Sequence, residues 1–342
     1  MEWWKPWELL RPFFSQAGYE LYNAVFGGEM SRPRTGDPPA LDSFGLHGDR
    51  TCFSSFFPPV YPNVFAARDR QNRDVVIKLI SKGEEGQSEK DILLFLNSEP
   101  LRSEPANATV RVIEWLDFQD YCFAVFPFCD GCDELPFLGA SECLDFIEQV
   151  LEVSTAKLTS IAQDVSHENI LVNHRGSLPP IAFFPPDGPP RAISPLSEWR
   201  STFPVRYLFI DFGRSVRFDR NIPLSECTAQ PSPEGRLHRA PETLGPKPYN
   251  PFAADVYQAA RLFYAWFPDL ADGNPDLLKL LQDMSCHDPS RRISVALALA
   301  RLRILRPNIL NDRCERTLHS FPSIPEDSHT LPSTYLSMGT SL

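Results

Sequence analysis

The segment at residues 161–173 reads IAQDVSHENILVN and holds two side chains that could do chemistry together. Asp164 could accept a proton or bind a metal ion, and Asn169, five residues later, could offer its amide oxygen to the same ion. The apolar run after Asn169 predicts a strand, so both side chains would lie on a short loop before it. The same residues are also compatible with a plain turn, in which Asp164 caps a local backbone amide.

Further short motifs occur in a fixed order around this loop. Before it, VVIK ends in Lys78 in a strand-like run, and Glu89 follows in a helix-like one; after it come FIDFG, HRAPE and DPSRRIS. A three-residue motif such as DFG occurs by chance in many proteins of this size, so each motif alone is weak. Their common order, with each motif on the type of element that it requires, is a much stronger signal.

In this order the motifs resemble those of eukaryotic protein kinases over about residues 55–305, and the chain is most similar to divergent kinase-like proteins of mushroom-forming fungi. The resemblance implies an α+β, bilobal fold that binds ATP between its lobes. A small β-rich N-lobe with one helix would cover about 46–128, and a larger, mainly helical C-lobe about 129–305. The implied function is an ATP-dependent protein kinase of the Ser/Thr type, which transfers the γ-phosphate of Mg·ATP to a protein hydroxyl.

The resemblance also implies a role for each polar residue of these motifs. Asp164 matches the catalytic base, Lys78 the lysine that holds the α- and β-phosphates of ATP, and Glu89 the carboxylate that pairs with this lysine. Asn169 and Asp211 match the side chains that hold Mg²⁺. ATP and Mg²⁺ are therefore the cofactors that we expect.

Two of these assignments have simple alternatives. Lys78 could be an ordinary strand lysine whose ammonium extends to water. Glu84 and Glu85 lie close to Glu89 in the sequence and compete with it for the ion pair, since eleven residues is a short gap between the lysine and its partner.

Four apolar residues would complete the nucleotide site. The resemblance places Val64, Val76 and Leu171 against the adenine, with Phe126 at the back of the pocket before a hinge that reads PFC. All four could equally belong to ordinary core packing, and the sequence does not separate these two interpretations.

The remaining motif residues have structural roles in the family that the chain resembles. They are Phe212, Gly213, Ala240, Pro241, Glu242, Asp255 and Arg292. The resemblance implies that Glu242 of APE forms a buried ion pair with Arg292, and that Asp255 opens a central helix and caps the catalytic loop. Small-molecule kinases of related fold generally lack the APE segment, so its presence favours a protein substrate, which the sequence does not identify.

Three departures from the family pattern keep other functions open. The segment SFFPPVYPNVFAAR at 55–68 has prolines in place of a glycine-rich phosphate loop, Ala162 and Gln163 replace a His-Arg pair, and Ser166 replaces a lysine. Glycine lets backbone amides approach phosphate and proline removes donors, so ATP binding would be weaker or would use a different lid. The main alternative is a pseudokinase scaffold that binds nucleotide weakly or not at all, and a small-molecule kinase is a third possibility.

Hydrophobic periodicity predicts the elements that would position these residues. Strands are predicted at 64–69, 74–80, 110–118, 121–128, 169–173 and 207–213, and helices at 88–98, 142–161, 253–267 and 292–303. Residues 1–45 read as an aromatic N-terminal extension and linker that packs on the domain. A Pro-rich insertion is predicted at 174–204, and a flexible polar tail at 306–342.

Composition and charge limit the classes of partner that the chain is expected to bind. The net charge of −11 argues against nucleic acid, because phosphate binding needs a basic face. No apolar stretch approaches the roughly 20 residues that cross a bilayer, and Glu2 and Lys5 within the apolar start disfavour a signal peptide. The eight cysteines lack regular spacing, and the close pair Cys129 and Cys132 predicts buried thiols rather than a metal or redox site. We therefore expect an intracellular protein, cytoplasmic or nuclear and not secreted, with no membrane span.

Overall fold

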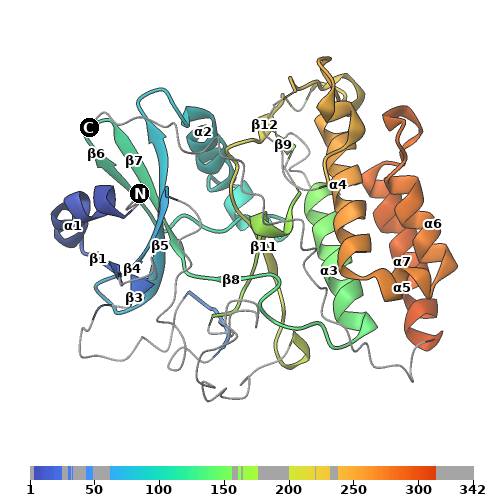
Figure 1. The fold of residues 1–342 in the computed structure, drawn as a ribbon, viewed down its shortest axis with the longest axis horizontal. Helices are drawn as coiled ribbons and strands as arrows, with labels where there is room; N and C mark the ends of the chain where they lie inside the picture. Colours follow the sequence, from blue (N-terminus) through green and yellow to red (C-terminus); the bar gives the residue numbers. More distant parts are fainter. Residues whose placement is uncertain are drawn as a thin grey trace, which may run out of the picture.

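The computed structural model describes residues 4–24, 30–31, 33, 44–48, 62–155, 161–162, 165–175, 200–219, 221–231 and 238–312. Within these residues the architecture is mixed α+β, with a curled antiparallel sheet at one end and a group of helices at the other (Figure 1). The helices are α1 (Lys5–Ala17), α2 (Gln87–Leu96), α3 (Ala140–Thr155), α4 (Pro251–Trp266), α5 (Pro268–Asp272), α6 (Pro275–Met284) and α7 (Val295–Asp312). The strands are β1 (Glu20–Leu21), β2 (Asn23–Ala24), β3 (Met30–Ser31), β4 (Val64–Arg68), β5 (Asp74–Lys82), β6 (Glu114–Phe118), β7 (Tyr121–Pro127), β8 (Asp130–Gly131), β9 (Ile161–Ala162), β10 (Ile170–Val172), β11 (Tyr207–Phe209) and β12 (Val216–Arg217).

The largest sheet has five strands in the order β1-β4-β5-β7-β6, and each neighbouring pair is antiparallel. Val64 of β4 lies opposite Lys78 of β5, and Phe126 of β7 lies opposite Val76. Successive side chains of a strand point to opposite faces of a sheet, and directly paired residues share a face. These four side chains therefore lie on the same face, which we call the inner face. The opposite one is the outer face.

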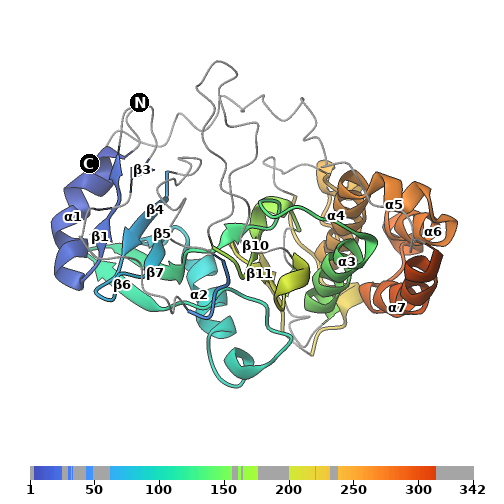
Figure 2. The same ribbon diagram turned by 90° about the horizontal axis from the view of Figure 1, so that it is seen from below.

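The outer face is closed by α1, which lies across the sheet from α2 in Figures 1 and 2. Apolar residues recur along α1 at helical spacing, so one side of this helix is apolar. Trp7 and Phe14 are buried there, and the Trp7 ring lies 5.2 Å from Phe65 and 5.8 Å from Phe123 between centroids. Gly18 ends the helix with φ 98, a left-handed conformation that glycine adopts without strain. Helix α1 is thus part of the core and not an appendage.

Helix α2 packs on the inner face, and the chain enters this helix through a tight turn. Gly86 has φ 78, and a Cβ there would lie 2.0 Å from the carbonyl oxygen of Ile80, so only glycine fits this entry. The buried side chains of α2 are Glu89, Ile92, Leu93 and Leu96. The three apolar ones anchor the helix in the core and leave Glu89, in the first turn, beside β5.

Helices α3 to α7 form the second part of the molecule. Two of them begin in the same way: the side chains of Asn250 and Asn274 each accept a hydrogen bond from the N–H three residues later, and proline follows as the first helical residue. Buried side chains of α3, α4, α6 and α7 belong to one hydrophobic core that also includes the apolar side of α2. This shared core connects the sheet to the helical group.

Two small sheets lie between the main sheet and the helices: β11-β10-β8 and the pair β12-β9. Asp130 of β8 is buried, and its carboxylate contacts the side chains of His174 and Arg175, which follow β10. His174 Nδ1 lies 2.9 Å from one carboxylate oxygen, and Arg175 Nη1 donates to the other at 3.4 Å. The Arg175 guanidinium also lies 3.6 Å over the ring of Phe128. These contacts fix the end of β10 against the chain that leaves β7.

Several predicted ends differ from the structure. Strand β6 begins at Glu114 and not at residue 110, because the Val110 N–H donates to the carbonyl of Phe209 in β11 and the chain reaches β7 only at Ile113. The helix predicted at 142–161 is described as far as Thr155. Helices α5 and α6 are absent from the prediction. The tail predicted from 306 is wrong for residues 306–312, because the buried Ile309 extends the apolar side of α7 to Asp312.

The domain boundary predicted at residue 46 also differs from the structure. Strand β1 pairs with β4, with Leu21 opposite Ala67, so part of the predicted extension belongs to the main sheet. Of the predicted Pro-rich insertion, Arg200 is buried and donates to the carbonyls of Cys132 and Leu135. Residues 176–199 and 313–342 lie outside the described residues.

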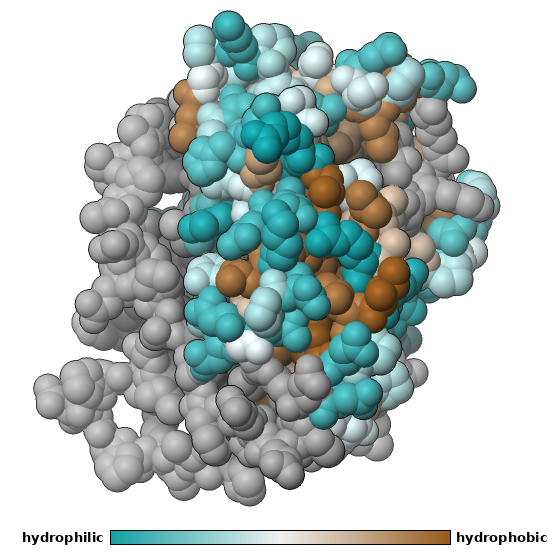
Figure 3. All heavy atoms as spheres, turned by 90° about the vertical axis from the view of Figure 1, so that its right-hand side faces the viewer, coloured by the Kyte–Doolittle hydropathy of each residue, from teal (hydrophilic) through white to brown (hydrophobic). Residues whose placement is uncertain are grey.

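The surface of the helical group is mainly polar. Figure 3 shows hydrophilic side chains with separate hydrophobic areas on the side of the molecule where α6 lies in Figure 1. Large exposed apolar side chains of α7 include Leu297 and Ile304. In the part of the chain that the structure describes, none of the helices is long and apolar enough to cross a membrane.

Candidate active site

Lys78 projects from the inner face of the sheet and meets two carboxylates. Its Nζ donates to Oε1 of Glu89 at 2.6 Å and to Oδ1 of Asp211 at 2.9 Å. The side chains of Lys78, Glu89 and Asp211 are 12%, 8% and 36% exposed. They come from a strand, a helix and the segment after β11, and we call them the Lys78 group. An ammonium has three N–H donors, and these two acceptors take two of them.

The structure selects Glu89 among the nearby carboxylates. Glu84 and Glu85 are exposed in the turn before α2, whereas Glu89 is buried. Oε1 of Glu89 also accepts the backbone N–H of Phe212 at 3.2 Å. Glu89 therefore ties α2 both to β5 and to the segment that follows β11.

Asp211 has a strained backbone. Its φ is 63, which is uncommon for a residue with a side chain, although Asp and Asn tolerate it better than most. Such conformations persist where the surroundings hold them, and they cluster at functional sites. On one side, the backbone next to Asp211 is held by the hydrogen bond from the Ile210 N–H to the Asn169 carbonyl at 3.0 Å. On the other side Phe212 is buried in the core.

The Lys78 group has one cation and two carboxylates. Burial lowers the pKa of Lys78, but the carboxylates of Glu89 and Asp211 outweigh this effect and raise the pKa above its usual value. Burial raises the pKa of Glu89, with Asp211 adding to this effect, against the opposing influence of Lys78 and of the Phe212 N–H. The two carboxylates keep Lys78 protonated, and because they exceed the one ammonium by one negative charge, the group favours an additional cation.

The two predicted Mg²⁺ ligands leave adjacent strands at the same end. Asn169 closes a 3₁₀ turn over His167–Asn169 directly before β10, and Asp211 follows β11. Because β10 and β11 are antiparallel partners, with Ile170 opposite Phe209, the start of one strand lies beside the end of the other. Asp164, the predicted base, lies outside the described residues.

Three of the four predicted adenine contacts share the inner face with Lys78. Val64 and Val76 are half-buried, and Phe126 is buried opposite Val76. Leu171 is half-buried on β10, in the small sheet, and packs against the main core. An apolar surface therefore adjoins the ammonium of Lys78, as a nucleotide base and its phosphates would require.

The structural motif residues lie in two places, the helical part and the segment beside Glu89. Arg292 Nη1 and Nη2 donate to the two carboxylate oxygens of Glu242 at 2.6 Å and 3.1 Å, a bidentate pair with the Arg292 side chain 1% exposed. Phe212 and Ala240 are buried, Pro241 begins the 3₁₀ turn that holds Glu242, and Gly213 is exposed after Phe212.

The prediction that Asp255 opens the central helix is wrong. Helix α4 begins at Pro251 with Asn250 as its cap, and Asp255 is half-buried in its second turn. Sequence reasoning missed the Asn-Pro start, which is itself a good helix signal.

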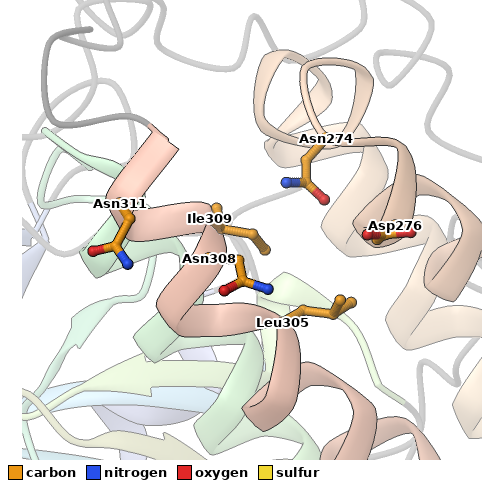
Figure 4. A pocket seen from close by; sticks show the side chains of 6 residues that line it. All are labelled: Asn274, Asp276, Leu305, Asn308, Ile309 and Asn311. Atoms are coloured by element: carbon orange, nitrogen blue, oxygen red, sulfur yellow. The ribbon is translucent and has the colours of Figure 1, made fainter.

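One cavity lies away from this site. It has a volume of about 320 Å³ and opens between α6 and α7 (Figure 4). Its lining residues are Asn274, Asp276, Leu305, Asn308, Ile309 and Asn311. A second cavity of about 290 Å³ lies beside Arg200. None of the candidate residues lines either one, so neither cavity identifies the active site.

Among the described residues, no group of three or more His, Cys, Asp or Glu side chains could hold a metal ion. Cys129 and Cys132 are both buried, and burial raises the pKa of Cys132 well above its usual value. A Mg²⁺ ion beside Asn169 and Asp211 would therefore need further oxygen ligands from a bound phosphate or from water.

Two contacts of this region were beyond the reach of sequence reasoning. One is the hydrogen bond from the Phe212 N–H to Glu89. The other is the contact of Arg217 with Phe95 of α2, in which the guanidinium carbon lies 4.3 Å from the ring centroid. Both depend on how segments far apart in sequence approach each other, and no motif signals them.

Comparison with known proteins leaves the function open. No protein-family model matches the chain, and no curated protein matches it either. The function must therefore be inferred from the Lys78 group and its surroundings.

Proposed function

We propose that this chain is an ATP-dependent protein kinase of the Ser/Thr type, which transfers the γ-phosphate of Mg·ATP to a protein hydroxyl. The main support is the ammonium of Lys78, which Glu89 and Asp211 hold from two sides while one of its three N–H groups stays available to a phosphate. Phosphoryl transfer requires the protein mainly to position groups and to neutralise charge. In this proposal the sheet and α2 form the N-lobe of a bilobal kinase fold, and α3 to α7 form its C-lobe.

The donor set fits Mg²⁺. Asn169 and Asp211 offer an amide and a carboxylate oxygen, which Mg²⁺ prefers over nitrogen or sulfur ligands, and the group carries one negative charge in excess. These two residues would hold the ion, which when bound offsets the charge of the phosphates. Asp211 is the more exposed of the two carboxylates, so a ligand can reach it.

The other roles follow the motif order. Asp164 would accept the proton of the substrate hydroxyl, and Lys78 would hold the α- and β-phosphates. Val64, Val76, Phe126 and Leu171 would surround the adenine. The bidentate pair of Arg292 with Glu242 supports a protein substrate, because it matches the APE segment that small-molecule kinases of related fold generally lack. An intracellular location is consistent with the free buried cysteines.

A pseudokinase scaffold is the second candidate, and one observation favours it. Asp211 and Glu89 already satisfy Lys78 without any ligand, and the prolines at 58–59 stand where a phosphate loop would supply backbone donors. An ion group whose charges already satisfy one another can have a purely structural role. The two candidates make opposite predictions for phosphate transfer.

The test is nucleotide binding and transfer with three proteins: wild type, Asp164→Ala and Lys78→Met. We expect Mg·ATP to raise the melting temperature of wild type and of Asp164→Ala, and γ-phosphate transfer to occur with wild type alone. Lys82→Met, which removes an exposed lysine from the same strand, is the matched control for Lys78→Met and should bind and transfer normally. Binding without transfer would establish the scaffold. Transfer that survives Asp164→Ala would reject the proposed base.

A further inference from the structure

Helix α2 carries Glu89 and has little intrinsic stability of its own. It has ten residues, and isolated helices shorter than about 12–15 residues are marginal in water. Its start at Gly86 has no side-chain cap. The orientation of α2, and with it the distance between Glu89 and Lys78, must therefore be set by tertiary contacts.

The contacts of Glu89 fix only the first turn of this helix. Phe95 lies six residues further on, which is about 9 Å along the helix axis. Its ring is half-buried and packs against the main core on one side. On the other side the guanidinium of Arg217 lies 4.3 Å from the ring centroid, well within the range of a cation–π contact. Besides the buried Leu93 and Leu96, the last turn of α2 thus has a further point of attachment outside the core.

Arg217 belongs to the part of the chain that carries the acidic site residues. It lies in β12, six residues after Asp211, and β12 pairs with β9, with Arg217 opposite Ile161. Strand β9 directly precedes the loop that contains Asp164. Arg217 therefore connects the far end of α2 to the two strands next to the proposed base and metal ligand.

We infer that Arg217 is a positioning residue for Glu89: its guanidinium on Phe95 holds α2 at the angle that keeps Glu89 on Lys78. The consequence for ATP rests on the proposed function. The contact involves no phosphorylated residue. Strand β12 pairs with β9, which ends at Ala162, where the sequence lacks the His-Arg pair of the kinase pattern. Arg217 would hold the site assembled without a phosphorylated partner.

The simpler hypothesis is that Arg217 is a surface charge that keeps the segment soluble and does not position α2. Its side chain is exposed, so its loss should leave the fold intact, and the urea midpoint of each variant serves to check this. The two hypotheses differ in what they predict for the stability of α2. A solvated charge has no influence on this helix, whereas a positioning residue does.

Amide hydrogen exchange of α2 tests the inference without nucleotide. We expect the amides of α2 to exchange about two- to five-fold faster in Arg217→Ala and Phe95→Leu, as the loss of one exposed cation–π contact implies. Arg217→Lys keeps a cation over the ring and should stay near wild type. Arg102→Ala removes another exposed arginine, just after α2, and should leave the exchange of α2 unchanged. No change in Arg217→Ala, or an equal change in Arg102→Ala, would overturn the inference.

A second measurement links Arg217 to Glu89. If Arg217 acts through Glu89, then Arg217→Ala weakens Mg·ATP binding in the wild-type background and has no additional effect in Glu89→Gln. Additive effects would reject this link. Should the wild type bind no Mg·ATP while the exchange of α2 still responds to Arg217→Ala, the proposed function would fail and the positioning role would stand.

Discussion

On the outer face of the main sheet, every second side chain of β4, β5 and β7 is apolar and packs under α1, whereas the inner face holds a lysine and two carboxylates among half-buried apolar residues. Val75 and Val76 illustrate the contrast within one strand. Val75 is 0% exposed in the aromatic cluster around Trp7. Val76, its neighbour, is half-buried and also touches this cluster, but the strand register places its side chain on the face of Lys78. The same strands thus supply one closed face and one partly open face.

The two faces also differ in the hydrogen-bond partners and the charge balance of their polar groups. On the outer side, the Trp7 indole N–H donates to the Pro62 carbonyl at 2.8 Å, and the Tyr19 hydroxyl donates to Glu114 at 2.5 Å. Each donor has one close acceptor there. On the inner side, one ammonium faces two carboxylates and Asp211 holds a left-handed backbone. Excess charge and local strain are costs that a purely structural face avoids, so the inner face is where function is expected.

Removal of the outer aromatic core gives the largest expected effect. Trp7→Ala should lower the free energy of unfolding by about 3–5 kcal/mol, because a buried Trp is lost and the cavity beneath α1 cannot fully collapse. Urea unfolding of the two proteins measures this difference. Leu9→Ala on the same helix, at a side chain that is 75% exposed, should change stability by less than about 0.5 kcal/mol. A loss below about 1 kcal/mol for Trp7→Ala would mean that α1 is not part of the core.

On the inner face the expected loss is one of binding. Asp211→Asn keeps the size of the side chain and tolerates the positive φ, but it removes a charge from the Lys78 group. We expect Mg·ATP to bind about 10- to 100-fold more weakly, as the loss of a charged contact implies. The free energy of unfolding should change by less than about 1 kcal/mol, because Asp211 is 36% exposed.

Titration calorimetry with Mg·ATP and urea unfolding together measure this separation of effects. Asp219→Asn, at an exposed carboxylate of the same segment, is the control and should bind like wild type. If Asp211→Asn binds Mg·ATP normally and instead unfolds much more easily, the Lys78 group is structural and the contrast between the two faces disappears.

The two adjacent valines of β5 offer a matched pair. Val75→Ala should lower the free energy of unfolding by about 2 kcal/mol and leave Mg·ATP affinity unchanged. Val76→Ala should cost less stability and weaken Mg·ATP binding about three- to ten-fold, because an apolar contact with the adenine is lost. The same two measurements apply to both variants. Equal stability losses with no change in affinity would show that Val76 belongs to the core alone.

The elements with a clear periodicity could be predicted from sequence. Alternating β-branched and aromatic residues located β4, β5 and β7, and helical spacing located α2, α3 and α4. The ion pair of Lys78 with Glu89 could be proposed from motif order, since a strand lysine and a helix carboxylate recur at such sites. The sequence left Glu84 and Glu85 as competing partners of Lys78, and these could be excluded only from the structure, because the entry angle that Gly86 gives to α2 places Glu89 beside β5.

Other features depend on long-range packing that no local pattern encodes. The spacing of Trp7 and Phe14 shows that α1 has an apolar side, but not that this side closes the main sheet. Residues 110–113 alternate like a strand, yet Val110 hydrogen-bonds to β11. The polar composition of the last residues predicted a tail from 306, but α7 continues to Asp312 because its apolar side extends to Ile309.

The smallest expected effect concerns His238, the first residue of the motif HRAPE. His238 is half-buried with φ 66. Burial, together with the charges of Arg261 and His167, lowers its pKa from the usual 6.5. Well above pH 6.5 the histidine is neutral in both the folded and the unfolded chain and contributes no pH dependence. As the pH falls below 6.5, the unfolded chain takes up a proton that the folded one resists, so stability falls.

His238→Asn removes this titration and keeps a residue that tolerates positive φ. Urea midpoints at pH 7.5 and pH 5.5 should therefore differ less in His238→Asn than in wild type, with the two proteins closest at pH 7.5. His287→Asn, at an exposed histidine, should follow wild type. An equal acid response in wild type and His238→Asn would place His238 in water. Since burial beside two cation-forming side chains is the cause of the shift, that result would also mean that the His167 turn and α4 do not enclose His238.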